Sequence, residues 1–166
     1  MKRIVSACLL LFFPLLSALA AAASFTDLQG RPADLLTQTG QGRWTVVMIW
    51  AHDCPVCNRE VEAWDLFHDA HADTDARVVG LSIDRSPEVA RRFVQEHELA
   101  FPSLVGSAQA VSRFLRQQTG RGLYGTPTFL LYDPAGKLVG MQVGPLPPDA
   151  VEEIMARHET GHETGG

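Results

Sequence analysis

Two cysteines separated by two residues, Cys54 and Cys57, stand where a strongly apolar run gives way to a helical pattern. The run, residues 44–50, is rich in β-branched and aromatic side chains and predicts a buried strand. Apolar residues then recur at helical spacing and predict a helix over about 55–72. Pro55 suits the first helical position, because its missing N–H would have no partner there. Cys54 is therefore expected at the helix N-terminus, where the helix dipole and the free amides stabilise a thiolate.

Cys57 is expected one helical turn beyond Cys54 on the same face, close enough to form a disulfide with it. Such a bridge is a weak structural staple, since closing a four-residue loop stabilises the fold by only about 2 kcal/mol. A metal site usually needs a second pair of ligands, and the sequence contains no second cysteine pair. The pattern therefore favours a redox-active dithiol over a structural bridge or a metal site.

The amino-terminal segment has the pattern of an export signal. Two basic residues precede an apolar stretch over residues 4–19, and the small residues of 18–23 offer an A-x-A cleavage site. We therefore predict that residues 1–23 are a signal peptide and that the protein is periplasmic. An uncleaved membrane anchor is the alternative, because the apolar stretch could nearly span a bilayer. Pro14 and the alanine-rich end favour cleavage.

Charge and cysteine content narrow the class of protein further. The chain of 166 residues has three cysteines and a formal net charge of −5. Loss of the signal would remove Cys8 and two basic residues, so the net charge would change from −5 to −7. An exported domain without cysteines outside its dithiol does not use disulfides as staples, which favours action on the thiols of other proteins. The length suffices for one domain with a proper core, and no basic patch suggests nucleic-acid binding.

The rest of the chain predicts strands alternating with helices. Residues 44–83 read as a strand–helix–strand unit with parallel strands. The other expected elements are a short edge hairpin near 25–32, a helix over 87–98, an extended piece at 101–105, a helix capped by Ser107, a strand opening at Pro127, a turn at 133–136, a returning strand over 137–143 and a helix over 148–157. We expect one domain over 24–158 and a disordered tail over 159–166.

Three sets of residues, taken in order, resemble those of thioredoxin-like proteins. They are Trp50-Ala51-x-x-Cys54-Pro55-Val56-Cys57-x-x-Glu60, then residues 124–129, then residues 133–137. The chain is most similar to exported thiol–disulfide interchange proteins of the TlpA, ResA and cytochrome-c-maturation type, over roughly 25–157. This resemblance implies an α/β thioredoxin fold, with a central mixed β-sheet flanked by helices and an inserted βα unit around 86–105.

The resemblance also implies roles for residues of the site. Cys54 would be the exposed nucleophile and Cys57 the resolving thiol. Pro127 would follow a cis peptide bond, and Thr126 would lie beside the dithiol and offer backbone groups to an incoming peptide strand. We place Trp50, at the start of the motif, with Thr126 and Pro127 among the substrate-binding residues.

Glu60 matches a glutamate of the reducing members of this branch, three residues after Cys57. A carboxylate near two sulfurs can shuttle protons, and its charge disfavours a thiolate, so that it raises the pKa of the thiols and favours a reductant. Ordinary thioredoxin has a buried aspartate at the position of Met48, and its absence here adds importance to Glu60. The alternative is a solvated glutamate on the helix surface.

The function that we expect is that of a protein-disulfide reductase without cofactor or metal. It would be a monomer that acts on substrate proteins and is kept reduced by a membrane electron donor. A disulfide oxidase is one alternative, but strong oxidases usually have a basic residue inside the motif, where this chain has Pro55 and Val56. A copper-handling module, using both cysteines and a histidine, is another. Asp53 should raise the pKa of Cys54 slightly, and a protonated His52 should lower it. The sequence does not decide the net shift of that pKa.

Overall fold

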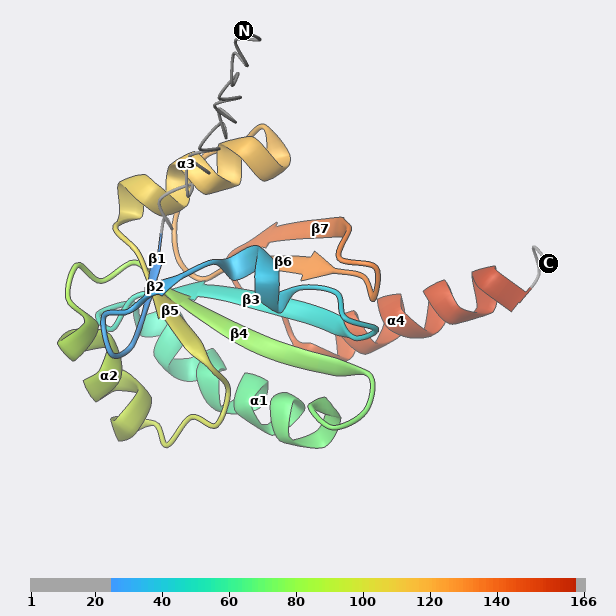
Figure 1. Ribbon diagram of the computed structural model, residues 1–166. Coiled ribbons are helices and arrows are strands. Elements are labelled where there is room, and N and C mark those ends of the chain that lie inside the picture. Colours follow the sequence, from blue (N-terminus) through green and yellow to red (C-terminus); the bar gives the residue numbers. More distant parts are fainter. Residues whose placement is uncertain (1–24, 164–166) are drawn as a thin grey trace, which may run out of the picture.

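The computed structural model describes residues 25–163, which form one seven-stranded sheet with helices on both faces (Figure 1). The strands are β1 (Phe25–Asp27), β2 (Pro32–Ala33), β3 (Trp44–Trp50), β4 (Ala76–Ser82), β5 (Ser103–Val105), β6 (Thr128–Tyr132) and β7 (Leu138–Val143). The helices are α1 (Pro55–His71), α2 (Pro87–Glu96), α3 (Ala108–Thr119) and α4 (Pro148–Glu163), with a short 3₁₀ helix, η1 (Leu35–Gln38), before β3.

The sheet is mixed, as predicted. Its strands lie in the order β2-β1-β5-β4-β3-β6-β7. The three central neighbours β5, β4 and β3 are parallel, while β1 and β6 pair antiparallel with β5 and β3. Helix α1 connects β3 to β4, and α2 connects β4 to β5, as expected of parallel neighbours. The helix and strand expected around residues 86–105 are therefore present as α2 and β5.

Both faces of the sheet are covered, which explains why β3 is apolar throughout. Val46, Met48 and Trp50 pack in one cluster with buried residues of α1, α2 and α4. Val47 and Ile49 pack on the other side with residues of η1 and α3. Figure 1 shows the same division, with α3 on one side of the sheet and α1, α2 and α4 on the other. A strand buried on both faces gives a continuous apolar run instead of an alternating one.

The register of the parallel strands brings three loops together. Trp50 of β3 pairs with Ser82 of β4, which pairs with Val105 of β5. The segments that follow these three strands therefore lie at one edge of the sheet, and each leads into a helix. Cys54, Ser86 and Ser107 are the N-caps of α1, α2 and α3, and each side chain accepts a hydrogen bond from an amide of the first turn.

The predicted elements are present, with two differences. The hairpin of β1 and β2 is followed by η1, which we did not predict, and Leu35 of η1 is fully buried. The last helix, predicted over 148–157, runs to Glu163, so part of the segment expected to be a disordered tail is helical. The predicted signal peptide lies outside the described residues. Within residues 25–163, no helix is long and apolar enough to span a bilayer.

Candidate active site

The two cysteines form a disulfide at the first turn of α1, with their Cα atoms 5.3 Å apart. Cys54 is the N-cap, Pro55 follows it in the first turn, and the Cys54 sulfur accepts a hydrogen bond from the amide of Cys57 at 3.1 Å. Cys54 is 7% exposed and Cys57 is 0% exposed. A reagent arriving from solvent therefore meets the sulfur of Cys54 first. The amides at a helix start favour negative charge on that sulfur.

The loop before β6 lies against the dithiol. The peptide bond between Thr126 and Pro127 is cis, as predicted. The carbonyl oxygen of Thr126 lies 3.3 Å from the sulfur of Cys54, which can donate a hydrogen bond to it when reduced. The carbonyl of Pro127 accepts a hydrogen bond from the amide of Gly144, so β6 remains tied to the segment after β7. The structure thus brings Cys54, Cys57 and Thr126 together.

Trp50 is placed differently from our expectation. It is the last residue of β3, and its side chain is 0% exposed. Because side chains alternate along a strand, Trp50 points to the same face as Met48, where its ring stacks on Phe93 with a centroid separation of 4.4 Å. Trp50 therefore presents no surface to a substrate, and the expectation that it binds one is corrected: the residue packs β3 against α2.

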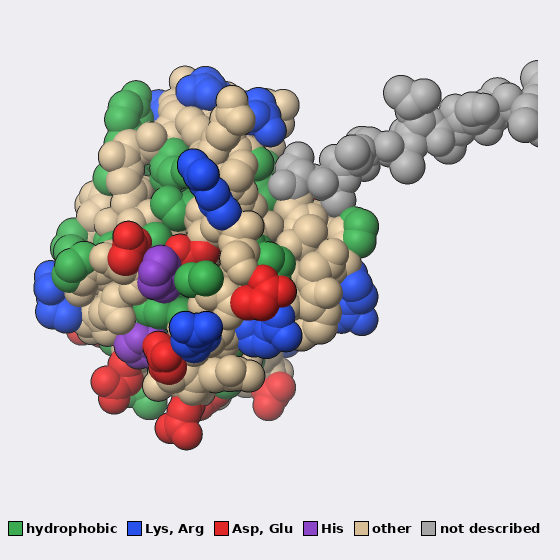
Figure 2. All heavy atoms as spheres, turned by 90° about the vertical axis from the view of Figure 1, so that its left-hand side faces the viewer, with side chains coloured by type: hydrophobic (Ala, Val, Ile, Leu, Met, Phe, Trp, Pro, Cys, Tyr) green, Lys and Arg blue, Asp and Glu red, His purple; other side chains and the backbone are tan. Residues whose placement is uncertain are grey.

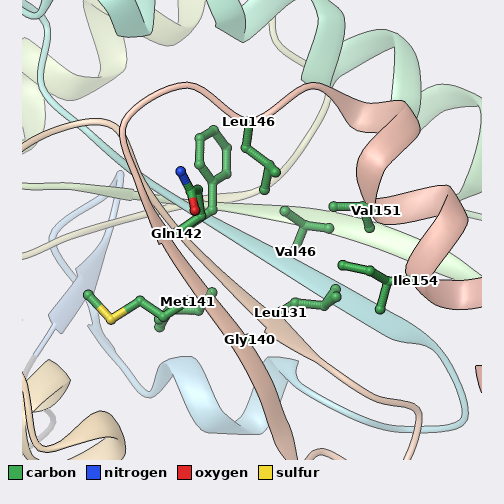
Figure 3. Close-up of a pocket in the computed structure, with 10 residues that line it drawn as sticks. Val46, Leu131, Gly140, Met141, Gln142, Leu146, Val151 and Ile154 are labelled. Atoms are coloured by element: carbon green, nitrogen blue, oxygen red, sulfur yellow. The ribbon is translucent and has the colours of Figure 1, made fainter.

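Glu60 lies half-buried on α1 and is held by a distant part of the chain. Its Oε2 accepts a hydrogen bond from the amide of Leu146, in the loop between β7 and α4, at 3.1 Å. Figure 3 shows the side chain of Leu146 together with Val151 and Ile154 of α4 over the sheet residues Val46 and Leu131. These residues line an apolar pocket of about 180 Å³. Glu60 is therefore anchored beside a hydrophobic surface and is not a freely solvated helix glutamate.

A histidine and an aspartate that the sequence did not link lie beside the motif. His52 Nδ1 is 2.7 Å from Asp84 Oδ1, and the backbone amide of His52 donates to Asp84 Oδ2 at 3.2 Å. The hydroxyl of Ser82 donates to the same carboxylate at 2.8 Å. The hydrogen bond to Asp84 raises the pKa of His52 above its ordinary value, with the charges of Asp84 and Asp53 acting in the same direction.

His52 and Asp84 also form, with Asp53, a group of potential metal ligands. Among the described residues, these three place one potential ligand atom each within 4.8 Å of one another. Two of the three are already bonded to each other, since Asp84 holds both the ring and the amide of His52. We therefore assign the cluster to a hydrogen-bonded imidazole–carboxylate pair and not to a metal site.

Asn58 completes the surroundings of the motif. From the first turns of α1, its Nδ2 donates to the carbonyl of His52 at 3.1 Å and to that of Cys54 at 2.8 Å. Its Oδ1 lies 3.1 Å from Nε2 of His97, the C-cap of α2. Figure 2 shows the end of the molecule where the parallel strands terminate, and histidine, acidic, basic and hydrophobic side chains are intermixed there. No single sign of charge dominates this face.

Comparison with known proteins agrees with this geometry. The model of the AhpC/TSA family matches residues 17–141. The chain belongs to this family. It is 22% identical to the sporulation thiol-disulfide oxidoreductase A of Bacillus subtilis, over 68% of this chain and 67% of that protein. It is 23% identical to the thiol-disulfide oxidoreductase ResA of Halalkalibacterium halodurans, over 78% and 69% of the two chains.

The fold is that of thioredoxin. A thiol:disulfide interchange protein of the thioredoxin family from Chlorobium tepidum superimposes with a TM-score of 0.66, at 19% identity, over 82% of this chain and 94% of that one. The resemblance to TlpA- and ResA-type proteins is therefore confirmed, and so is the thioredoxin fold. Together with the disulfide between Cys54 and Cys57, these findings support a redox function of the thiol–disulfide oxidoreductase class.

Proposed function

We propose that the protein is an exported protein-disulfide reductase that acts through Cys54 and Cys57. The observation that carries the proposal is the asymmetry of the two sulfurs. Cys54 lies at the helix start between the amide of Cys57 and the carbonyl of Thr126, whereas Cys57 is fully buried. This arrangement suits one sulfur to attack a substrate and the other to resolve the product.

In the proposed reaction two electrons pass from the dithiol to the substrate. The thiolate of Cys54 attacks one sulfur of a substrate disulfide, which forms a mixed disulfide and releases the other substrate sulfur as a thiolate. The thiolate of Cys57 then attacks the Cys54 sulfur and releases the second substrate thiolate, which leaves the Cys54–Cys57 disulfide that the structure contains. Protons return to the substrate thiolates, and a donor of two electrons must reduce the protein again.

Three further groups have proposed roles in this reaction. The carbonyl of Thr126, next to cis-Pro127 and partly exposed, would pair with an extended substrate strand. Glu60 would take and return the proton of Cys57, from one turn further along α1. We propose in addition that residues 1–23 direct export to the periplasm, that the protein works as a monomer, and that a membrane protein supplies the electrons.

The direction of the reaction is tested by equilibrating the dithiol with glutathione buffers. We expect a potential nearer to the roughly −270 mV of thioredoxin than to the roughly −120 mV of strong oxidases. The reason is that Pro55 and Val56, inside the motif, supply no positive charge to stabilise the Cys54 thiolate. The matched control is Val56→His, which adds a basic group and should raise the potential. A wild-type potential above about −150 mV would exclude a reductase.

The substrate is identified by trapping. In Cys57→Ala the first step can still occur, but the mixed disulfide is not resolved, so the substrate remains bound to Cys54. The control is Cys54→Ala, which should trap nothing because it lacks the attacking sulfur. Equal trapping by the two variants would remove the assigned roles, and stronger trapping by Cys54→Ala would reverse them.

A further inference from the structure

The pair of His52 and Asp84 is built into the loops that follow β3 and β4, and His52 is two residues before Cys54 in the chain. Asp84 is mostly buried, with 8% of its side chain exposed, while the side chain of His52 is 52% exposed. The carboxylate of Asp84 accepts hydrogen bonds from the amide of His52, the ring of His52 and the hydroxyl of Ser82. The amide of Asp84 donates in turn to the Ser82 hydroxyl at 3.0 Å. A buried carboxylate with this many partners holds a fixed position.

The same loop is held to Cys54 from the other side. The side-chain amide of Asn58 donates hydrogen bonds to the carbonyls of both His52 and Cys54. The backbone amide of Cys54 donates to the carbonyl of Ala51 at 3.2 Å. His52 and Cys54 are two residues apart, so their Cα atoms are at most about 7.6 Å apart. Asp84 therefore fixes the direction of the imidazole, and Asn58 holds the backbone of His52 to that of Cys54.

The charge on His52 depends on several groups that face it. The hydrogen bond with Asp84 raises its pKa most, and the negative charges of Asp84 and Asp53 act in the same direction. Partial burial and the positive charge of Arg92, on α2, lower it. His97, also next to α2, lies close to this loop through Asn58. Since Nδ1 faces the carboxylate, the titrating proton is the one on Nε2, at the half-exposed edge of the ring.

We propose that His52, held by Asp84, is a positioning residue whose protonation is thermodynamically coupled to the thiolate of Cys54. A charged imidazole stabilises the thiolate, and by reciprocity the thiolate strengthens the binding of the proton to His52. Two-electron reduction of the disulfide leaves a thiolate on Cys54 and, after uptake of one proton, a thiol on Cys57, so His52 binds its proton more tightly in the reduced protein wherever Cys54 is deprotonated. The proposal rests on the role of Cys54 as the reactive thiol, but not on the direction of electron flow.

The coupling is measured by NMR titration of the histidine ring signals in the full chain, between pH 5 and 9, in the oxidised and the reduced protein. At a charge separation of roughly 10 Å in water, a thiolate should raise the proton affinity of His52 about twofold. His71 is the matched internal control. It too is paired with an aspartate, since its Nδ1 is 2.8 Å from Asp75 Oδ1, but it lies at the far end of α1, about 25 Å along the helix axis from Cys54. Reduction of the disulfide should leave the ring signals of His71 unchanged.

A variant separates coupling from a merely structural role. In His52→Gln the amide can still donate to Asp84, but the charge is absent. We expect the pH at which Cys54 becomes reactive to iodoacetamide to rise in this variant, with the far-ultraviolet spectrum unchanged. Identical titration of His52 in the oxidised and reduced proteins would overturn the proposal. A strongly oxidising potential would instead refute the reductase direction and leave this coupling intact, so the two failures are distinguishable.

Discussion

Gly80, on β4, is closely packed against Ser103, Trp50 and Phe101, and its replacement by alanine should destabilise the protein. A Cβ atom at this position would lie 2.3 Å from Oγ of Ser103, 2.8 Å from Nε1 of Trp50 and 3.1 Å from a ring carbon of Phe101. Gly80 pairs with Met48 of β3 on one side and with Ser103 of β5 on the other, so the backbone on both sides is held by the sheet. The side chains must therefore move.

The expected magnitude follows from two opposing effects. A methyl group forced into a packed core costs about 1–3 kcal/mol. Replacing glycine within a strand by alanine gains about 0.5–1 kcal/mol. Overpacking is the larger effect, and we expect Gly80→Ala to lower the free energy of unfolding by about 1–2 kcal/mol. For a chain of this length the Tm should fall by about 3–6 °C.

The assay is thermal and urea unfolding of the oxidised protein, with two comparison variants. In Gly140→Ala, on β7, the new Cβ meets only Cβ of Leu131 at 3.8 Å, an ordinary contact, so this variant should be as stable as wild type or slightly more stable. Adding Ser103→Ala to Gly80→Ala removes the closest clash and should restore part of the loss. This second change costs little itself, because the Ser103 hydroxyl has no hydrogen-bond partner among residues 25–163. Wild-type stability of Gly80→Ala would refute the argument.

Three other outcomes are expected. Glu60→Gln should lower the pKa of the cysteine thiols, because a negative charge near them is removed, and it should slow disulfide reduction. Thiolate absorbance at about 240 nm against pH and the turnover rate measure the two effects. Superimposable titration curves with unchanged turnover would leave Glu60 a structural residue. Ser107→Ala should lower the free energy of unfolding by about 1 kcal/mol, because the Ser107 hydroxyl accepts a hydrogen bond from the amide of Ala110 at the start of α3. Chemical denaturation measures this loss, and an unchanged midpoint would contradict it. Burial lowers the pKa of His68, whose Nδ1 accepts a hydrogen bond from the amide of Val78. The unfolded state therefore binds more protons, and the free energy of unfolding should fall as the pH drops below 6.5. Denaturation at several pH values checks this, and His68→Gln should show a flatter dependence of stability on pH.

The sequence predicted those features that depend on neighbouring residues. The strand over 44–50, the start of α1 at Pro55 and the capping by Ser107 each follow from a short pattern, and the structure agrees with each. The cis bond before Pro127 followed from resemblance to a family, and the structure contains it. In these cases the local chemistry and the tertiary structure favour the same conformation.

The features that the sequence did not reveal depend on strand order and register. Glu60 and Leu146 are 86 residues apart and meet only because the segment after β7 returns to α1. His52 and Asp84 are 32 residues apart and meet because β3 and β4 are adjacent and parallel. The rule that residues after parallel strands gather at one edge of the sheet was available as a signal for Asp84. For Trp50, the alternation of side chains along β3 is the signal in the sequence, because it places Trp50 with Met48 on one covered face of the sheet.

The position of β3 between β4 and β6 accounts for the two different surroundings of Cys54. Strand β4 is parallel to β3, so the residues at the end of β4 lie beside the end of β3, and this brings Asp84 to His52. Strand β6 is antiparallel to β3, so the residues before β6 lie beside the same end, and this brings the carbonyl of Thr126 to Cys54. One neighbour therefore supplies the carboxylate that holds an imidazole whose charge depends on pH, and the other supplies a backbone acceptor whose dipole does not. A change at Asp84 should alter the pH dependence of the thiol, whereas displacement of the Thr126 carbonyl should alter its reactivity at every pH.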